Sequence, residues 1–351
     1  MKKPFPVYLL FTLIIIGTVN CNESGKAGSI SIVSAVNVMD TAHAETGADE
    51  PATITPLAVA IDTTEYNQKM LALGNNDPAG KWPVKTVYPL PGAVFPDHRV
   101  VAFYGNLYSK RMGILGEIPR DSMLGKLKEE VAAWQLADPS TKAIPALHYI
   151  ATTAQGAAGR DGKYRLRMPH HQIDTILKWA KEINALTFVD VQVGHSTVKE
   201  EVPLFEKYLA QPNVHLGIDP EFSMKNGERP GSKIGTFSAD DINDAVDFLA
   251  ALVRKHKLSP KVLVVHRFTR GMITDYEKIR IVPEVQVVID MDGFGDKELK
   301  KATYKQYIYK EPVQFTGFKL FYKNDNAGSA TIFTPGELMQ MVPRPVYIQY
   351  Q

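Results

Sequence analysis

From Arg99 to Gln351 the sequence alternates short apolar runs with amphipathic helical segments, and this alternation repeats eight times. Such short, continuous apolar runs are typical of parallel strands that are buried on both faces. Parallel neighbours require a crossover between them, which is usually a helix. Eight strand–helix units in about 250 residues are what a closed barrel needs. We therefore predict an α/β fold, a (β/α)8 TIM barrel over residues 99–351.

The boundaries of these units follow from the same pattern. The predicted strands are Val100–Asn106, Ala143–Ile150, Thr187–Gly194, Val214–Phe222, Lys261–Phe268, Val285–Gly293, Phe315–Tyr322 and Val346–Tyr350. The predicted helices are 122–136, 170–184, 199–210, 239–256, 269–279, 297–307 and 335–341. An open doubly wound sheet competes with the barrel, but Tyr104-Gly105-Asn106 is a poor match to its Gly-rich turn after the first strand.

The N-terminus has the pattern of an export signal. Lys2 and Lys3 precede an uncharged apolar run over 8–16. A helix that spans a bilayer needs about 20 apolar residues, so this run is too short to be one. Cys21, the single cysteine, then follows and resembles a bacterial lipoprotein cleavage site, although Thr18 and Asn20 depart from the usual residues. We predict a lipoprotein-type signal peptide at 1–21, lipidation at Cys21 and a cell-envelope location at the outer face of a membrane. An ordinary secretory signal is the alternative.

Two segments separate this signal from the barrel. Residues 22–65 are rich in small and polar residues and carry little that could form a core, which predicts a flexible tether. Residues 66–98 contain repeated Pro and Gly, which predicts an irregular lead-in or a pad under the barrel. The formal net charge of +2 lacks the basic excess of nucleic-acid-binding proteins, so no nucleic-acid partner is predicted.

Acidic residues close three of the predicted strands, at the end of a barrel where working residues lie. The fourth strand ends with Asp219 and Glu221, and the sixth ends with Asp290 and Asp292. Alternate residues of a strand share a face, so each pair points one way. The other candidates at strand ends are Tyr104, Asn106, His148 or Tyr149, Asp190, Gln192, His266, Arg267, Lys319, and Gln349 or Tyr350.

Crowded carboxylates repel one another, and proteins keep such groups for acid/base work, cation binding or polyhydroxylated ligands. A strand-end aspartate such as Asp219 also has a purely structural interpretation, since it commonly binds loop amides. The polar, glycine-containing loops Ala154–Tyr164 and Ser223–Thr236 follow the second and fourth strands and are expected to shape a cleft.

The segment Gly217-Ile218-Asp219-Pro220-Glu221-Phe222 resembles glycoside-hydrolase barrels, many of which place their acid glutamate at the end of the fourth strand. The D-x-x-D-x-D-x-E motif of chitinase-type barrels is incomplete, because Val214 and Gly217 occupy its first two acidic positions. The segments VVAFYGN, GIDPEF and PRPVYIQYQ make the chain similar to a family of secreted bacterial TIM-barrel lipoproteins.

This resemblance implies an enzyme that acts on a carbohydrate or cell-wall glycan. Glu221 would protonate the leaving oxygen, Asp219 would raise the pKa of Glu221, and Asp290 or Asp292 would act as nucleophile or base. The predicted substrate-binding residues are Asp190, Gln192, His266, Lys319, Tyr104, Tyr149 and Tyr350. Barrel packing is the alternative role for the three tyrosines. No cofactor is predicted, and no metal ligands are assigned.

Two other functions remain open at this point. A metal-dependent hydrolase could use His148, Asp190, His266 and Asp290, which are suitable ligand types, but the first strand lacks the H-x-H pair of barrel amidohydrolases. A non-catalytic glycan-binding or surface lipoprotein on a degenerate hydrolase barrel is the other alternative, because fold does not imply function. A serine or cysteine nucleophile is disfavoured, because no G-x-S-x-G lies at a strand end.

Overall fold

The computed structural model describes residues 61–325 and 331–351. The predicted signal peptide with Cys21 and nearly all of the predicted tether lie outside the described residues. No helix in the described ranges combines the length and the apolar character that crossing a membrane requires.

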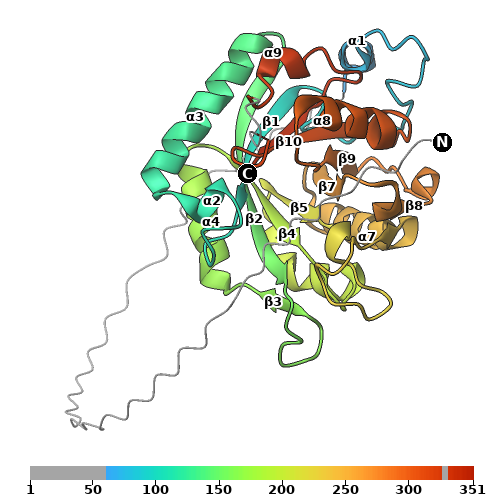
Figure 1. The fold of residues 1–351 in the computed structure, drawn as a ribbon. Helices are drawn as coiled ribbons and strands as arrows, with labels where there is room; N and C mark the ends of the chain where they lie inside the picture. Colours follow the sequence, from blue (N-terminus) through green and yellow to red (C-terminus); the bar gives the residue numbers. More distant parts are fainter. Residues whose placement is uncertain (1–60, 326–330) are drawn as a thin grey trace, which may run out of the picture. The chain divides into compact units, whose positions relative to one another are not determined.

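Eight parallel strands form one closed barrel, which confirms the predicted fold class (Figure 1). The strand order is β1-β11-β10-β9-β7-β5-β4-β2, and a further pairing of β1 with β2 closes the ring. The strands are β1 (His98–Gly105), β2 (Lys142–Ala154), β4 (Leu186–Val191), β5 (Val214–Ile218), β7 (Lys261–Arg267), β9 (Val285–Met291), β10 (Phe315–Leu320) and β11 (Tyr347–Tyr350). All eight predicted strands are therefore present. A short strand β3 (Arg165–Arg167) extends β2 in antiparallel pairing, and β6 (Phe237–Ser238) pairs with β8 (Ile273–Thr274).

Helices surround the barrel (Figure 1). They are α1 (Thr63–Gly74), α2 (Ile114–Glu117), α3 (Arg120–Ala137), α4 (His170–Glu182), α5 (Val198–Glu201), α6 (Glu206–Leu209), α7 (Ala239–His256), α8 (Lys297–Thr303) and α9 (Pro335–Leu338). Helix α7 has the predicted bounds because Asp241 accepts a hydrogen bond from the Ser238 amide at 2.7 Å at its start, in a capping box. Its last turn ends at Lys257, which adopts the left-handed conformation.

Some crossovers differ from the prediction. The helix predicted at 269–279 is wrong, because this segment forms two 3-10 turns, η3 (Arg270–Met272) and η4 (Tyr276–Lys278). The helix predicted at 199–210 is divided into α5, the 3-10 turn η1 (Val202–Phe205) and α6, since Pro203 enters the first turn of η1. Helix α8 continues as a π-helical segment, η5 (Tyr304–Tyr309).

Two apolar layers hold the barrel together. The larger one lies between the strands and the helical shell and includes Val101, Phe103, Leu216 and Ile218. The smaller one fills the barrel interior, where Val100, Ala102, Phe188, Val264 and Tyr347 pack together. Inner and outer residues thus alternate along each strand.

Helix α1 covers the N-terminal end of the barrel interior. Its buried residues Tyr66, Met70 and Leu73 join the interior layer together with Phe95. The sequence did not predict this helix, which lies across the expected boundary between tether and lead-in. His215 and Gln286 are also buried inside the barrel near this plug, whereas the acidic interior residues lie at the C-terminal end.

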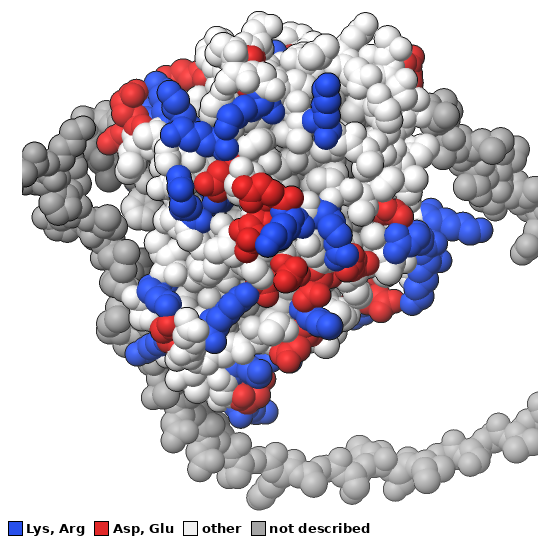
Figure 2. Space-filling model, turned by 90° about the vertical axis from the view of Figure 1, so that its right-hand side faces the viewer, with Lys and Arg blue, Asp and Glu red and all other residues white. Residues whose placement is uncertain are grey.

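Charged side chains of opposite sign are interleaved on one face of the molecule. Figure 2 shows one face, on which Lys and Arg side chains lie among Asp and Glu side chains. Several of the surface charges form ion pairs, such as Arg254 with Glu284 at 2.7 Å and Lys278 with Asp275 at 3.0 Å. This face therefore presents no field of a single sign.

Candidate active site at the mouth of the barrel

Polar residues gather inside the barrel at the C-terminal ends of the strands, directly above the apolar interior layer. This mouth cluster consists of Tyr104, His148, Asp190, Gln192, Asp219, Glu221, His266, Asp290, Asp292, Lys319 and Gln349. All except Glu221 are buried, and Glu221 is partly exposed. The two predicted carboxylate pairs are thus brought together with five predicted substrate-binding residues, as strand parity leads us to expect. These five are Tyr104, Asp190, Gln192, His266 and Lys319.

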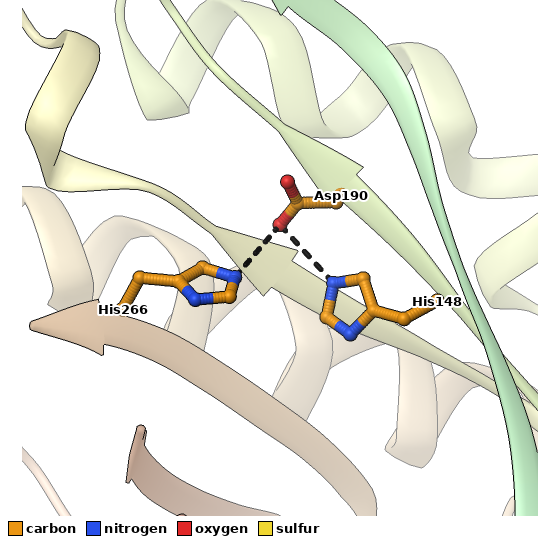
Figure 3. A group of neighbouring side chains, drawn as sticks. All are labelled: His148, Asp190 and His266. Atoms are coloured by element: carbon orange, nitrogen blue, oxygen red, sulfur yellow. Dashed lines mark ion pairs between the residues drawn. The ribbon is translucent and has the colours of Figure 1, made fainter. Parts of the chain in front are cut away.

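The centre of the mouth cluster is Asp190 on β4 with two histidines. Its Oδ1 lies 3.2 Å from Nε2 of His148 on β2 and 3.6 Å from Nε2 of His266 on β7. Figure 3 shows both imidazole rings pointing toward this one carboxylate. The other oxygen, Oδ2, accepts a hydrogen bond from the Tyr104 hydroxyl at 3.0 Å. Side chains from β1, β2 and β7 therefore converge on the carboxylate of Asp190 on β4.

The second ring nitrogen of His148, Nδ1, also has polar neighbours. Nδ1 of His148 lies 2.5 Å from the Tyr347 hydroxyl and 3.1 Å from Nε2 of Gln349. The ring of His148 stacks on Phe188 with centroids 5.2 Å apart. These neighbours fix the orientation of the His148 ring.

His266 connects the central group to the acids of β9. Its Nδ1 lies 3.1 Å from Oδ2 of Asp292 and 3.5 Å from Oδ2 of Asp290. Oδ1 of Asp292 in turn pairs with Lys319 Nζ at 2.9 Å, and this ammonium lies 3.9 Å from the centre of the Tyr104 ring. The result is one connected network from β2 to β10.

Glycines provide the room for this network. A β-carbon at Gly317 on β10 would lie 2.4 Å from Oδ1 of Asp290, and Gly217 on β5 stands as close to the central group. Since real β-carbons do not approach other atoms so closely, neither position accepts a side chain without displacing the acids. The inner positions of Gly217 and Gly317 therefore carry no side chain and leave room for the polar side chains of neighbouring strands.

Asp219 has the structural role considered above as an alternative. Its Oδ1 accepts a hydrogen bond from the Glu221 amide at 2.9 Å and so begins the 3-10 turn η2 (Pro220–Phe222). Its Oδ2 accepts from Gln192 Nε2 at 3.3 Å, while Gln192 Oε1 accepts from the Ala154 amide. Asp219 thus fixes the turn that carries Glu221.

Burial and neighbouring charges raise the pKa of some acids in the mouth cluster and lower the pKa of others. Burial, together with the nearby charges of Asp219 and Asp292, raises the pKa of Glu221, and burial likewise raises that of Asp219. Burial raises the pKa of Asp290 as well. Asp292 is different, because Lys319 and His266 outweigh its burial and lower its pKa. The mouth cluster therefore places carboxyl groups with a raised pKa beside one whose pKa is lowered.

The two histidines also differ. Burial lowers the pKa of His148 to about 4, so its imidazole is neutral at pH 7. Burial opposes protonation of His266 too, but the charge of Asp292 and its contacts with Asp190 and Asp290 raise the pKa of His266 well above its usual value. The hydrogen-bonding contacts from both imidazoles outweigh burial at Asp190 and lower its pKa.

Two predicted binding residues lie elsewhere. Tyr149 points to the helical shell, where its hydroxyl donates to Gln172 on α4. Tyr350 also faces outward, and its hydroxyl accepts from Trp134 Nε1 on α3 at 3.0 Å. Both tyrosines therefore pack between barrel and helices and are not in the mouth cluster. Their strand neighbours His148 and Gln349 take the inner positions.

The cluster is most accessible at Glu221. Two cavities lie at the opposite, N-terminal end of the barrel, one beside Trp82 and Pro343 and one beside Arg99 and Asp138, and neither is lined by a residue of the mouth cluster. The most exposed residue of the cluster thus lies on η2.

No family model and no curated protein matches this chain. Among solved structures, similar folds include a 2,3-dimethylmalate lyase described as a PEP mutase/isocitrate lyase superfamily member, at 13% identity and a TM-score of 0.39, covering 73% of this chain and 76% of that one. The cellulase Cel5C_n has 10% identity and a TM-score of 0.40, covering 72% and 75%. A Burkholderia cenocepacia dihydropteroate synthase has 11% identity and a TM-score of 0.35, covering 76% and 92%. The similarity to all three concerns the fold alone.

Proposed function

We propose that this protein hydrolyses glycosidic bonds, with Glu221 as the proton donor. The observation that carries the proposal is the position of Glu221 at the accessible edge of the mouth cluster, beside Asp219 and in the field of Asp292. A carboxyl group with a raised pKa next to an ionised carboxylate is the arrangement that glycoside hydrolysis requires.

In this mechanism the protonated Glu221 donates its proton to the leaving glycosidic oxygen. Asp292 is the favoured second carboxylate, because Lys319 holds it in place at 2.9 Å and it is slightly exposed, whereas Asp290 is fully buried. It would attack the anomeric carbon directly or activate a water molecule, depending on its distance from Glu221 across the bound sugar. Gln192 and Tyr104 would bind sugar hydroxyls.

We further propose that the substrate is a glycan of the cell envelope or its surroundings. The apolar run over 8–16 and Cys21 support export and anchoring of the barrel to a membrane by a lipid. An anchored hydrolase would meet polymeric glycans at the outer face of that membrane.

The test is a panel of glycans that includes peptidoglycan and host-type oligosaccharides, incubated with the purified protein. Glu221→Gln keeps the shape of the side chain but has no proton to donate, so we expect it to lose at least about 100-fold in rate. Glu228→Gln is the matched control, because Glu228 lies in the loop that follows η2 and pairs with Lys233. Its activity should equal that of the wild type.

Failure to cleave any glycan of the panel would refute the enzymatic proposal. If the wild type and Glu221→Gln then bound a glycan with equal affinity, the protein would be the non-catalytic glycan-binding barrel instead.

A further inference from the structure

We infer that His148, Asp190 and His266 bind one divalent transition-metal ion, of the class of Zn²⁺, Fe²⁺ or Mn²⁺. The inference rests on the central group of the mouth cluster and does not depend on the proposed glycosidic activity. Glu221 lies outside this three-residue set, on the turn beyond β5.

The first support is the spacing of the three ligand atoms. A Zn–N bond is about 2.0–2.1 Å long, so two ligands at a tetrahedral angle are about 3.4 Å apart. Asp190 Oδ1 lies 3.2 Å from Nε2 of His148 and 3.6 Å from Nε2 of His266. All three atoms lie within 4.8 Å of one another. The side chains therefore already have almost the separation that a shared ion would give them (Figure 3).

The second support is that these atoms lack other partners. His148, Asp190 and His266 are all completely buried. Within the described ranges, neither Nε2 atom nor Asp190 Oδ1 makes a hydrogen bond to any group outside the trio. A buried polar atom without a hydrogen bond is costly. Three such atoms that converge on one point are accounted for if an ion lies between them.

The third support is the set of contacts around the three residues. Metal-binding histidines usually use their second nitrogen to contact a carboxylate or another polar group, which fixes the tautomer and the ring. Here Nδ1 of His266 faces Asp292 at 3.1 Å, and Nδ1 of His148 faces the Tyr347 hydroxyl at 2.5 Å. Tyr104 holds the second oxygen of Asp190. Each proposed ligand thus has an outer partner.

The ligand types define the class of ion. Two imidazole nitrogens and one carboxylate oxygen suit Zn²⁺ and Fe²⁺, whereas Mg²⁺ and Ca²⁺ prefer oxygen ligands throughout. A divalent ion would also balance the carboxylates of the mouth cluster, in which Lys319 is the single lysine or arginine.

The test is metal binding by the full-length protein after dialysis against a chelator. Calorimetric titration with ZnCl2 should give one site per chain, and CoCl2 should produce visible absorption bands of a nitrogen-coordinated ion. Asp190→Asn and His148→Ala should each weaken Zn²⁺ binding by more than about 100-fold, since the loss of an outer partner alone costs 10–100-fold. His171→Gln is the control, because His171 is exposed at the start of α4. It should bind Zn²⁺ as the wild type does.

Equal Zn²⁺ affinity in Asp190→Asn, His148→Ala and the wild type would overturn the inference. Loss of Zn²⁺ binding in His171→Gln alone would also overturn it, because the ion would then bind at the surface. If the ligand variants fail to fold, Tyr347→Phe replaces them, and an unchanged affinity in that variant would count against the site. Since the readout is binding, a protein that binds Zn²⁺ without cleaving glycans would refute the proposed function alone.

Discussion

Gly217 lies so close to His148 that a β-carbon at this position would be 2.4 Å from His148 Nε2 and equally close to Asp190 Oδ1. Gly217→Ala should therefore push both side chains apart. We expect a loss of about 1–3 kcal/mol in unfolding free energy, as for other overpacked interiors, together with weaker Zn²⁺ binding. Denaturant titration and calorimetry measure the two effects.

Gly125→Ala is the control for this substitution. Gly125 lies within α3, and a β-carbon there would meet no atom within 4 Å. Alanine is the better helix former, so this variant should be more stable by up to about 1 kcal/mol. If Gly217→Ala were equally harmless, the close packing of Gly217 against His148 and Asp190 would be contradicted.

The pH dependence of catalysis should report the pKa of Glu221. The proton donor must be protonated, so kcat/KM should fall as the pH rises through this raised pKa, well above the usual range of glutamate. Asp219→Asn preserves the acceptor that begins η2 but removes a neighbouring charge, which should lower the pKa of Glu221. The alkaline limb of the plot of kcat/KM against pH should then move to lower pH. A limb that stays in place would show that Asp219 does not influence the proton donor.

The ion pair between Arg99 and Asp138 should contribute strongly to stability. Arg99 is fully buried and donates to Asp138 at 2.8 Å. Asp138→Asn leaves a buried guanidinium without its counter-ion, which should cost about 3 kcal/mol in unfolding free energy. Asp121→Asn removes a far more exposed partner of Arg120 and should change stability by less than about 0.5 kcal/mol.

The same pair predicts acid sensitivity. Burial would raise the pKa of Asp138, but the hydrogen bonds from Ser140 and Arg99 outweigh it and lower the pKa to about 2. Because the folded-state pKa is below the unfolded one, this stabilisation is present above pH 4 and is lost as the pH falls toward 2. In Asp138→Asn, the slope of stability against pH in this range should be shallower.

Lipidation at Cys21 can be tested in cells. Cys21→Ala removes the only thiol, so the full-length protein should move from the membrane fraction to a soluble or signal-retaining form, and labelling with a radioactive fatty acid should be lost. Ser29→Ala, a change in the predicted tether, should leave the distribution unchanged. Wild-type protein without fatty-acid label would contradict the anchor.

The barrel could be predicted because eight runs buried on both faces leave few alternatives. The same property hides which residues point inward, since both faces of a parallel strand are apolar. Tyr149 and His148 were therefore equally good candidates at the end of the second strand, and the irregular pairing of β2 with β4 between Ile150 and Thr152 adds to the ambiguity. Gln349 and Tyr350 posed the same problem.

Carboxylates were better guides to the mouth cluster than aromatic residues. Asp290 and Asp292 cannot lie against the apolar helical shell without partners, so their side of the strand is decided by charge. A tyrosine is stable on either side, as Tyr104 and Tyr350 show. The vacant positions at Gly217 and Gly317 could not be predicted, because their role depends on which neighbouring side chains fill the space.

The pairing of β1 with β11 has a consequence for how the protein is made. Val100 lies beside Tyr347, so the ring joins one of the earliest strands of the barrel to one synthesised long afterwards. Without β11, a gap would separate β1 from β10, and His148 would lose its contacts with Tyr347 and Gln349. The burial that shifts the pKa values of His148 and Asp190 is therefore complete only in a barrel in which β11 is paired on both sides.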